Sequence, residues 1–109
     1  MNIGSVVYTK EFLTGKMTAV WNLQNGDKIV TGTGIAQGDA GATYSGTYRI
    51  TYYTADKTEA GSYILKINEV FGSYYLNWYC NDILKCSGIG MLNENRLIAG
   101  WSKIMRESD

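Results

Sequence analysis

The stretch TYSGTYRITYY, residues 43–53, decides the fold class. Its even-numbered positions from 44 to 52 carry tyrosine, isoleucine or glycine, and its odd-numbered positions from 43 to 51 carry threonine, serine or arginine. Successive side chains of a β-strand point to opposite faces, so this alternation predicts a strand with one buried face. Tyrosine, threonine and isoleucine are also residues that strands favour.

The same period of two residues continues on both sides of this stretch, and no long segment shows the 3.6-residue period of a helix. Leu97, Ala99 and Trp101, for example, alternate with Arg96, Ile98 and Ser102 near the C-terminus. We therefore expect eight strands. They lie near residues 5–10, 17–23, 28–36, 43–53, 61–70, 73–80, 83–91 and 96–103.

Short turns separate these strands. Asn25-Gly26 is a strong hairpin signal because both residues accept a positive φ. Residues 55–57, 81–82 and 93–95 occupy the corresponding places in later connections. Connections this short make consecutive strands antiparallel neighbours.

An up-and-down meander of eight strands has two exposed edges if it stays open, and closing the sheet removes both. The sequence therefore predicts an all-β fold, a closed or nearly closed antiparallel barrel. Residues 1–12 show the weakest alternation. A six-stranded barrel with this segment packed outside is the alternative.

Length and charge restrict the classes of function. A chain of 109 residues suits one domain, so we expect residues 1–109 to form a single β-barrel domain. Ten Lys plus Arg balance ten Asp plus Glu without a basic cluster, which argues against nucleic acid as a partner. No apolar run approaches the roughly 20 residues of a membrane helix, and the first residues do not resemble a signal peptide. We expect a cytoplasmic protein without a membrane partner.

Histidine is absent from the sequence, so neither a Ser-His-Asp nor a Cys-His arrangement can form. Cys80 and Cys86 are too few for a zinc site without histidine. We expect these cysteines to be free thiols, with a bridge across a hairpin as the alternative. The sequence thus predicts a protein that is not an enzyme, with no catalytic residues, no metal and no cofactor.

Two hairpins of the chain resemble each other, at residues 21–35 and 78–91. Each has an aromatic strand, a turn, and a strand with Thr/Ser-Gly-x-Gly. Glycines at alternate positions leave space on one face for large rings opposite, whereas a dinucleotide site would need a third glycine and a following helix. The expected pairs are Trp21 with Gly32 and Gly34, and Trp78 with Gly88 and Gly90.

Glycines and aromatic residues between positions 44 and 103 also carry a resemblance to a known group of proteins. The matching runs are Gly46-x-Tyr48, Gly61-x-Tyr63-x-Leu65, Tyr75-x-Asn77-Trp78, Ser87-Gly88-Ile89-Gly90-Met91 and Leu97-x-x-x-Trp101. This pattern resembles small bacterial β-rich domains of undetermined role, some of them labelled fibronectin-binding-like. The resemblance implies a barrel like those of lipocalins and avidin, and it carries over no catalytic or ligand-binding residue.

Aromatic residues make up 13% of the chain, and most of them fall on the predicted inward face. The inward row comprises Trp21, Tyr44, Tyr48, Tyr52, Tyr63, Tyr74, Trp78 and Trp101. An eight-stranded barrel is wide enough either to be filled by side chains or to hold one small ligand. Aromatic walls with a few polar tips are typical of small-molecule pockets. The candidate binding residues for a small apolar or aromatic ligand are Trp21, Tyr48, Tyr63, Trp78 and Trp101; an interior simply filled by these rings is the alternative.

A second hypothesis is a structural or interaction protein that self-associates through an outward aromatic face or a sheet edge. Tyr53, Tyr75 and Tyr79 have the opposite parity to the inward row, so we expect them to form an outward aromatic patch. Because a net charge of zero opposes association only weakly, we expect a homodimer.

Overall fold

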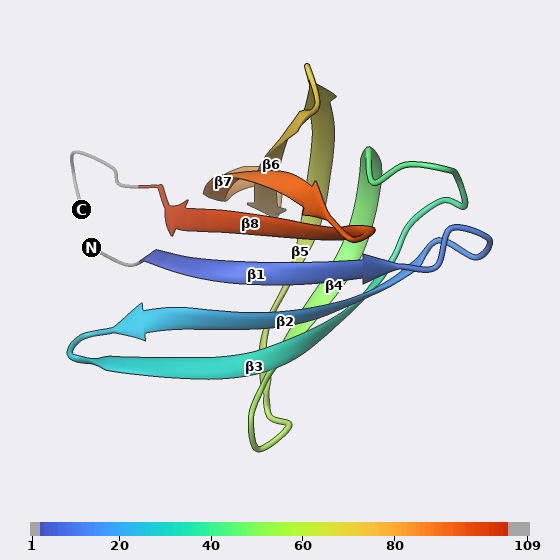
Figure 1. The fold of residues 1–109 in the computed structure, drawn as a ribbon. Helices are drawn as coiled ribbons and strands as arrows, with labels where there is room; N and C mark the ends of the chain where they lie inside the picture. The colour runs from blue at the N-terminus through green and yellow to red at the C-terminus, as the bar shows by residue number, and fades with distance from the viewer. Residues whose placement is uncertain (1–2, 105–109) are drawn as a thin grey trace.

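A computed structural model describes residues 3–104, which form β-strands joined by turns and loops (Figure 1). The strands are β1 (Ile3–Lys10), β2 (Lys16–Asn25), β3 (Lys28–Gln37), β4 (Gly46–Thr54), β5 (Glu59–Val70), β6 (Ser73–Cys80), β7 (Ile83–Asn93) and β8 (Arg96–Lys103). Each strand pairs antiparallel with the next, and β8 pairs with β1. The predicted all-β, up-and-down barrel of eight strands is confirmed. No helix within residues 3–104 has the length and apolar character needed to cross a membrane.

The first strand is part of the closed ring. Val6 of β1 lies opposite Trp21 of β2 and opposite Ala99 of β8. Val6 and Tyr8 are both buried. The alternative of a six-stranded barrel with the first segment packed outside is therefore wrong for the described residues.

The strand predicted at residues 43–53 begins later than expected, at Gly46. Gly46 has a φ of 145°, which residues with a side chain rarely adopt, and this conformation interrupts the extended run. Tyr44 consequently lies in the loop between β3 and β4, although its side chain is still buried. The predicted inward row is otherwise placed as expected, because all eight of its members lie in the core or pack against it.

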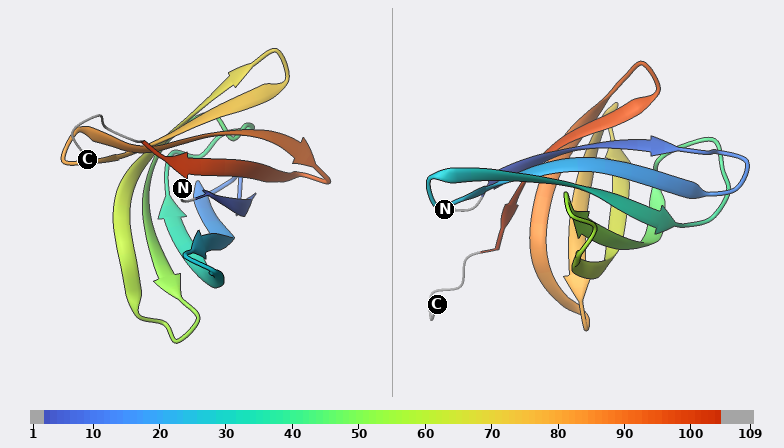
Figure 2. Two further views of the ribbon diagram at one scale, coloured as in Figure 1. Left: turned by 90° about the vertical axis from the view of Figure 1, so that its left-hand side faces the viewer. Right: turned by 90° about the horizontal axis from the view of Figure 1, so that it is seen from below.

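The barrel has two different ends. At one end lie the β2–β3, β4–β5 and β6–β7 turns together with the start of β1 and the finish of β8 (Figure 1). We call this the open end. The other four connections lie at the opposite end, which we call the closed end. Figure 2 shows the sheet coiling round on itself, with the β2–β3 and β4–β5 hairpins projecting beyond the ring.

The closed end is plugged by hydrogen-bonded side chains. The Lys10 ammonium donates to the Thr43 carbonyl at 2.8 Å and to the Tyr48 hydroxyl at 3.0 Å. The Tyr48 hydroxyl donates in turn to the Tyr44 carbonyl at 2.7 Å, and the Tyr44 hydroxyl donates to the Asn95 carbonyl at 2.7 Å. These bonds tie the loop after β3 across the end of the barrel.

Lys10 is a buried cation, with only 6% of its surface exposed. Its ammonium lies over the Tyr48 ring, 5.1 Å from the ring centroid, and such cation–π contact compensates part of the lost hydration. Burial lowers the pKa of Lys10, and the Asp39 carboxylate opposes this shift. The Lys10 ammonium therefore links the loop after β3 to the barrel wall, because Thr43 of the loop and Tyr48 of β4 both contact it.

Buried tyrosines make the fold sensitive to alkali. Burial raises the pKa of Tyr48 to about 12 and also raises the pKa values of Tyr8 and Tyr52. In the unfolded chain these phenols ionise near pH 10, so above that pH the unfolded state loses protons that the folded state retains. Their contribution to stability is complete below pH 10 and is lost as the pH rises toward the folded pKa values. The lowered pKa of Lys10 makes the free energy of unfolding rise with pH, but this is the effect of one group, whereas three tyrosines lower that free energy.

We therefore expect the free energy of unfolding to fall steadily above pH 10, as measured by urea denaturation at a series of pH values. In a spectrophotometric titration, the phenolate absorbance of these three residues should appear only together with loss of the β-sheet circular dichroism signal. Complete ionisation of all nine tyrosines in a still folded protein would contradict the burial described here.

Candidate ligand-binding site

A recess of about 170 Å³ enters the barrel at its open end. Its lining comes from seven strands, all except β3. Its lining residues are Val6, Trp21, Leu23, Tyr52, Ala60, Tyr63, Trp78, Cys86, Trp101 and Lys103. We refer to this cavity as the aromatic recess, because five of these residues are tryptophan or tyrosine.

Two glycines allow tryptophan rings to lie flat against the wall of the recess. Gly32 of β3 lies opposite Trp21 of β2, and a β-carbon at Gly32 would overlap the Trp21 ring. Gly4 of β1 lies opposite Trp101 of β8, and a β-carbon there would fall 2.5 Å from the Trp101 ring. A glycine opposite each ring is thus the local reason that both indoles point into the barrel.

The prediction that two glycine pairs would accommodate Trp21 and Trp78 is right only for Gly32. Gly34 approaches the ring of Tyr52 instead, at 2.9 Å from an added β-carbon. In the second hairpin Trp78 lies opposite Cys86, one position before a register shift in the β6–β7 pairing. A β-carbon at Gly88 or Gly90 would lie closest to atoms of residues 97–101 in β8, not to Trp78.

The rings in the recess meet edge to face or at a tilt. Trp21 and Tyr52 have centroids 6.3 Å apart with an interplanar angle of 85°, and Tyr52 and Tyr63 lie 6.0 Å apart at 57°. On the other side of the recess Trp78 and Trp101 lie 6.3 Å apart at 52°. Such arrangements are favourable for aromatic pairs, and they leave ring faces free to contact a third flat group.

Polar groups at the floor of the recess are already paired. The Trp78 indole N–H donates to the Tyr52 hydroxyl at 2.7 Å, and the hydroxyls of Tyr52 and Tyr8 lie 2.6 Å apart. Burial raises the pKa values of both phenols, so the pair stays neutral at physiological pH. The Trp21 indole N–H donates to the Thr33 carbonyl at 2.8 Å. These hydrogen bonds connect different strands of the barrel, so the groups that form them are not free to bond to a ligand.

Two polar groups of the lining remain available to a ligand. Every buried polar side-chain atom within residues 3–104 has a hydrogen-bond partner. The Trp101 indole N–H and the Tyr63 hydroxyl form no hydrogen bond to any described residue, and both residues are only partly buried. Both groups are therefore accessible to solvent, so a ligand atom or water can bond to them.

The one Lys, Arg, Asp or Glu side chain in the lining of the recess is a cation. Lys103 lines the mouth, and its ammonium and that of Lys85 both act to lower the pKa of the Cys86 thiol. Burial has the larger effect and raises the pKa of Cys86, so the thiol stays protonated. An acceptor or a carboxylate on a ligand would find a complementary charge at this mouth.

The two cysteines are free. Cys80 lies opposite Ile83, whereas Cys86 lies opposite Trp78, so they are not partners across the β6–β7 hairpin. Their predicted state as free thiols agrees with this register. Within the described part of the chain, no three or more His, Cys, Asp or Glu side chains come together as a potential metal site.

The structure brings four of the five predicted site residues together. Trp21, Tyr63, Trp78 and Trp101 all line the aromatic recess. Tyr48 lies at the closed end instead, fully buried in the Lys10 network. The recess also contains residues that the sequence did not indicate as site residues: Val6, Leu23, Tyr52, Ala60, Cys86 and Lys103. Of these only Tyr52 carried a signal, as a member of the inward row.

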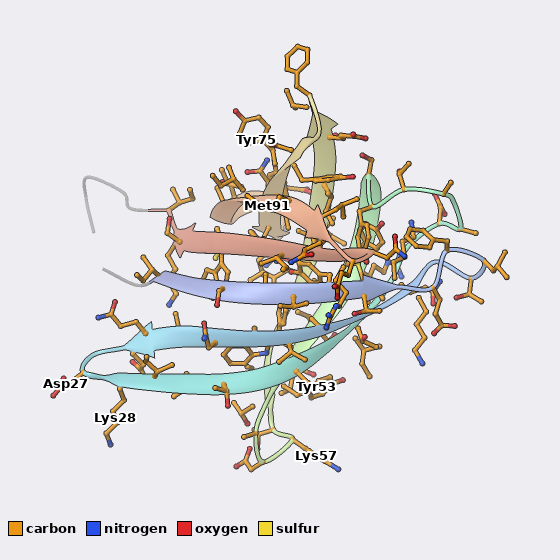
Figure 3. All side chains as sticks on the ribbon, in the orientation of Figure 1. Asp27, Lys28, Tyr53, Lys57, Tyr75 and Met91 are labelled. Atoms are coloured by element: carbon orange, nitrogen blue, oxygen red, sulfur yellow. The ribbon has the colours of Figure 1, made fainter. Side chains whose placement is uncertain are left out.

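The predicted outward patch of tyrosines does not form. Along β5, Tyr53 of β4 is level with Glu59 and Tyr75 of β6 is level with Asn68, nine residues further along. At about 3.3 Å per residue this separates the two tyrosines by roughly 30 Å, and Figure 3 shows them on opposite sides of the molecule. Tyr79 is instead covered by Lys66, whose ammonium lies 5.1 Å from the ring centroid.

Comparison of the chain with models of known families, with curated proteins and with solved structures finds no match.

Proposed function

We propose that this protein is a non-enzymatic binding module that takes one small apolar or aromatic ligand into the aromatic recess. The supporting observation is a cavity of about 170 Å³ walled by five aromatic residues at the open end of the barrel. An apolar cavity of about 150 Å³ in another small protein binds benzene, so this volume suits a ligand of one ring or two fused rings. Hydrophobic walls with few polar groups are the usual composition of such sites.

The contrast between the two ends of the barrel supports this proposal over an interior that is simply filled. At the closed end Tyr44 and Tyr48 occupy the interior and bond to one another and to Lys10. At the open end Tyr63 and Trp101 are only partly buried and have polar atoms without protein partners among residues 3–104. The same kind of residue is therefore used as filling at one end and left accessible at the other.

The polar groups of the recess favour a ligand with an acceptor on its ring. Trp101 and Tyr63 of the lining each carry a donor that is free among residues 3–104, and Lys103 of the lining carries a positive charge. The same groups give little support to catalysis, because the thiol and phenols are neutral and no carboxylate lines the recess. We accordingly favour binding without chemical conversion.

A fluorescence titration tests the proposal. Toluene, benzoate and a steroid are added separately to the protein while tryptophan emission is recorded. We expect the two one-ring compounds to change the emission saturably, benzoate more tightly than toluene at low salt, and the steroid to have no effect because it exceeds the recess. If neither toluene nor benzoate changes the emission saturably, the proposed function is wrong.

A further inference from the structure

The outer surface carries an apolar face on the opposite side of the sheet from the recess. Its members are Val70, Tyr75, Ile89, Met91 and Ile98, and we refer to them as the outer apolar face. Tyr75, Ile89 and Met91 are each more than half exposed, at 54%, 66% and 64%. Tyr75 lies opposite Ile89 and Met91 lies opposite Ile98, so the face is continuous over β6, β7 and β8. In Figure 3 Tyr75 and Met91 lie on the same side of the molecule.

A groove of about 500 Å³ runs through this face. Gly100 contributes to its floor, and a β-carbon there would meet only the Gly4 carbonyl oxygen, at 4.0 Å, so the missing side chain leaves a hollow. No charged residue lines it. The lining residues are Ser5, Val70, Ser73, Tyr74, Tyr75, Ile89, Gly90, Met91, Ile98, Ala99 and Gly100. A contiguous apolar surface of this kind is typical of a site that another molecule covers.

Phe71 stands beside this groove, and none of the residues 3–104 covers its side chain. It is fully exposed at the tip of the β5–β6 turn, and the flanking residues Val70 and Ser73 line the groove. Its φ is 52°, in the left-handed region where glycine or asparagine would be less costly. A phenyl ring held in water on an unfavourable backbone suggests a contact outside the chain.

We propose that two copies of this chain form a dimer in which Phe71 of each copy inserts into the groove of the other. A two-fold axis brings the same patch of both copies together, so a chain that has both the projecting ring and the matching hollow forms two equal contacts at once. The groove has no charge to repel its copy, and the chain has no net charge. Because the barrel is closed, each strand already has two neighbours, and association by strand addition at a free edge is not available.

The exposed area is sufficient for a stable dimer. Phe71 and the outer apolar face together present on the order of 700 Å², and a standard interface buries roughly 800 Å² per partner. An exposed aromatic residue that fills a partner's pocket is the common form of an interface hot spot. We therefore expect Phe71 to contribute a large share of the dimer affinity.

Sedimentation velocity over a wide range of protein concentrations tests this proposal. We expect the unmodified protein to be a dimer, and Phe71→Ser to raise the dissociation constant by roughly 30-fold or more. Ile89→Asp, which places a charge in the groove, should have the same effect. Leu13→Ser is the matched control, because Leu13 is also almost fully exposed at a turn but lies at the β1–β2 connection. Its dimer should be unchanged.

Circular dichroism of each variant establishes that it is folded. A second measurement locates the contact: in a mixture of labelled and unlabelled protein, isotope-filtered NOEs should connect the Phe71 ring of one copy to the Met91 methyl group of the other. A protein that stays monomeric at all concentrations, or a dimer that survives both Phe71→Ser and Ile89→Asp, would overturn the proposal. Ligand binding to the aromatic recess is independent of either result.

Discussion

Replacing Gly32 with valine is expected to lower the free energy of unfolding by at least about 4 kcal/mol, close to the whole stability of a small domain. A β-carbon at position 32 would overlap the Tyr53 carbonyl oxygen on one side and the Trp21 ring on the other. The carbonyl belongs to the neighbouring strand of the ladder, so it cannot move without breaking the β3–β4 pairing. Overpacking at a backbone contact is among the most destabilising changes that a core can undergo.

Thermal unfolding followed by circular dichroism measures this effect. For a domain of this size a loss of about 4 kcal/mol lowers the melting temperature by roughly 20 °C or leaves the protein unfolded. Gly41→Val is the control, because a β-carbon at Gly41 meets no atom within 4 Å. That variant should melt within a few degrees of the unmodified protein. Equal melting temperatures for the two variants would show that Gly32 is not needed to seat Trp21.

Replacing Trp101 with alanine is expected to weaken the binding of a one-ring ligand by roughly 30-fold, the effect of removing one aromatic hot spot. Trp101 supplies a ring face beside Trp78 and the indole N–H that has no partner among the described residues. Because Trp101 is only partly buried, the barrel should tolerate its loss better than the loss of Trp78.

Isothermal titration of benzoate compares the variants. Tyr79→Ala is the control, since it removes an aromatic residue from the outer face of β6 and leaves the recess lining intact. It should bind as the unmodified protein does. An unchanged dissociation constant for Trp101→Ala, in a variant shown to be folded, would place the ligand elsewhere.

The architecture was predictable because its cause is local. The alternation in residues 43–53 and its continuation in both directions determine which side chains face inward, and short turns determine the order of the strands. Closure then follows from the cost of leaving two edges unpaired. The structure confirms each of these steps, including the first strand, whose weak alternation had left a smaller barrel as an alternative.

The position of each residue along the barrel axis was not predictable in the same way. Parity shows that Tyr48 and Tyr63 both point inward, but it does not show that Tyr48 joins the Lys10 network whereas Tyr63 lines the aromatic recess. That depends on the stagger between strands, which is a property of the whole barrel. Register shifts after Tyr52 and after Trp78 add to the effect, because they change which residues oppose each other. The wrong placement of Trp78 beside Gly88 and Gly90 has another origin. Trp78 lies two residues before the pair that closes its turn, Cys80 and Ile83, whereas Trp21 lies four residues before the corresponding Asn25.

The groove and Phe71 left no signal in the sequence. Phe71-Gly72 occupies a turn between two strands, and an apolar residue in a turn gives no indication of how far its side chain projects. Likewise, Lys103 appears in the sequence as one charge at the end of a strand. Its place at the mouth of the recess follows only from the path of β8 beside β7.

The indole N–H region of a two-dimensional ¹H–¹⁵N NMR spectrum tests the central claim most directly, because the chain has three tryptophans and each gives one resolved signal. Trp21 and Trp78 donate to protein acceptors, so their N–H protons should exchange slowly, whereas that of Trp101 should exchange quickly. Addition of benzoate should shift the Trp101 signal most and slow its exchange. Three slowly exchanging signals that no one-ring compound moves would mean that the open end is filled, and the account would be contradicted.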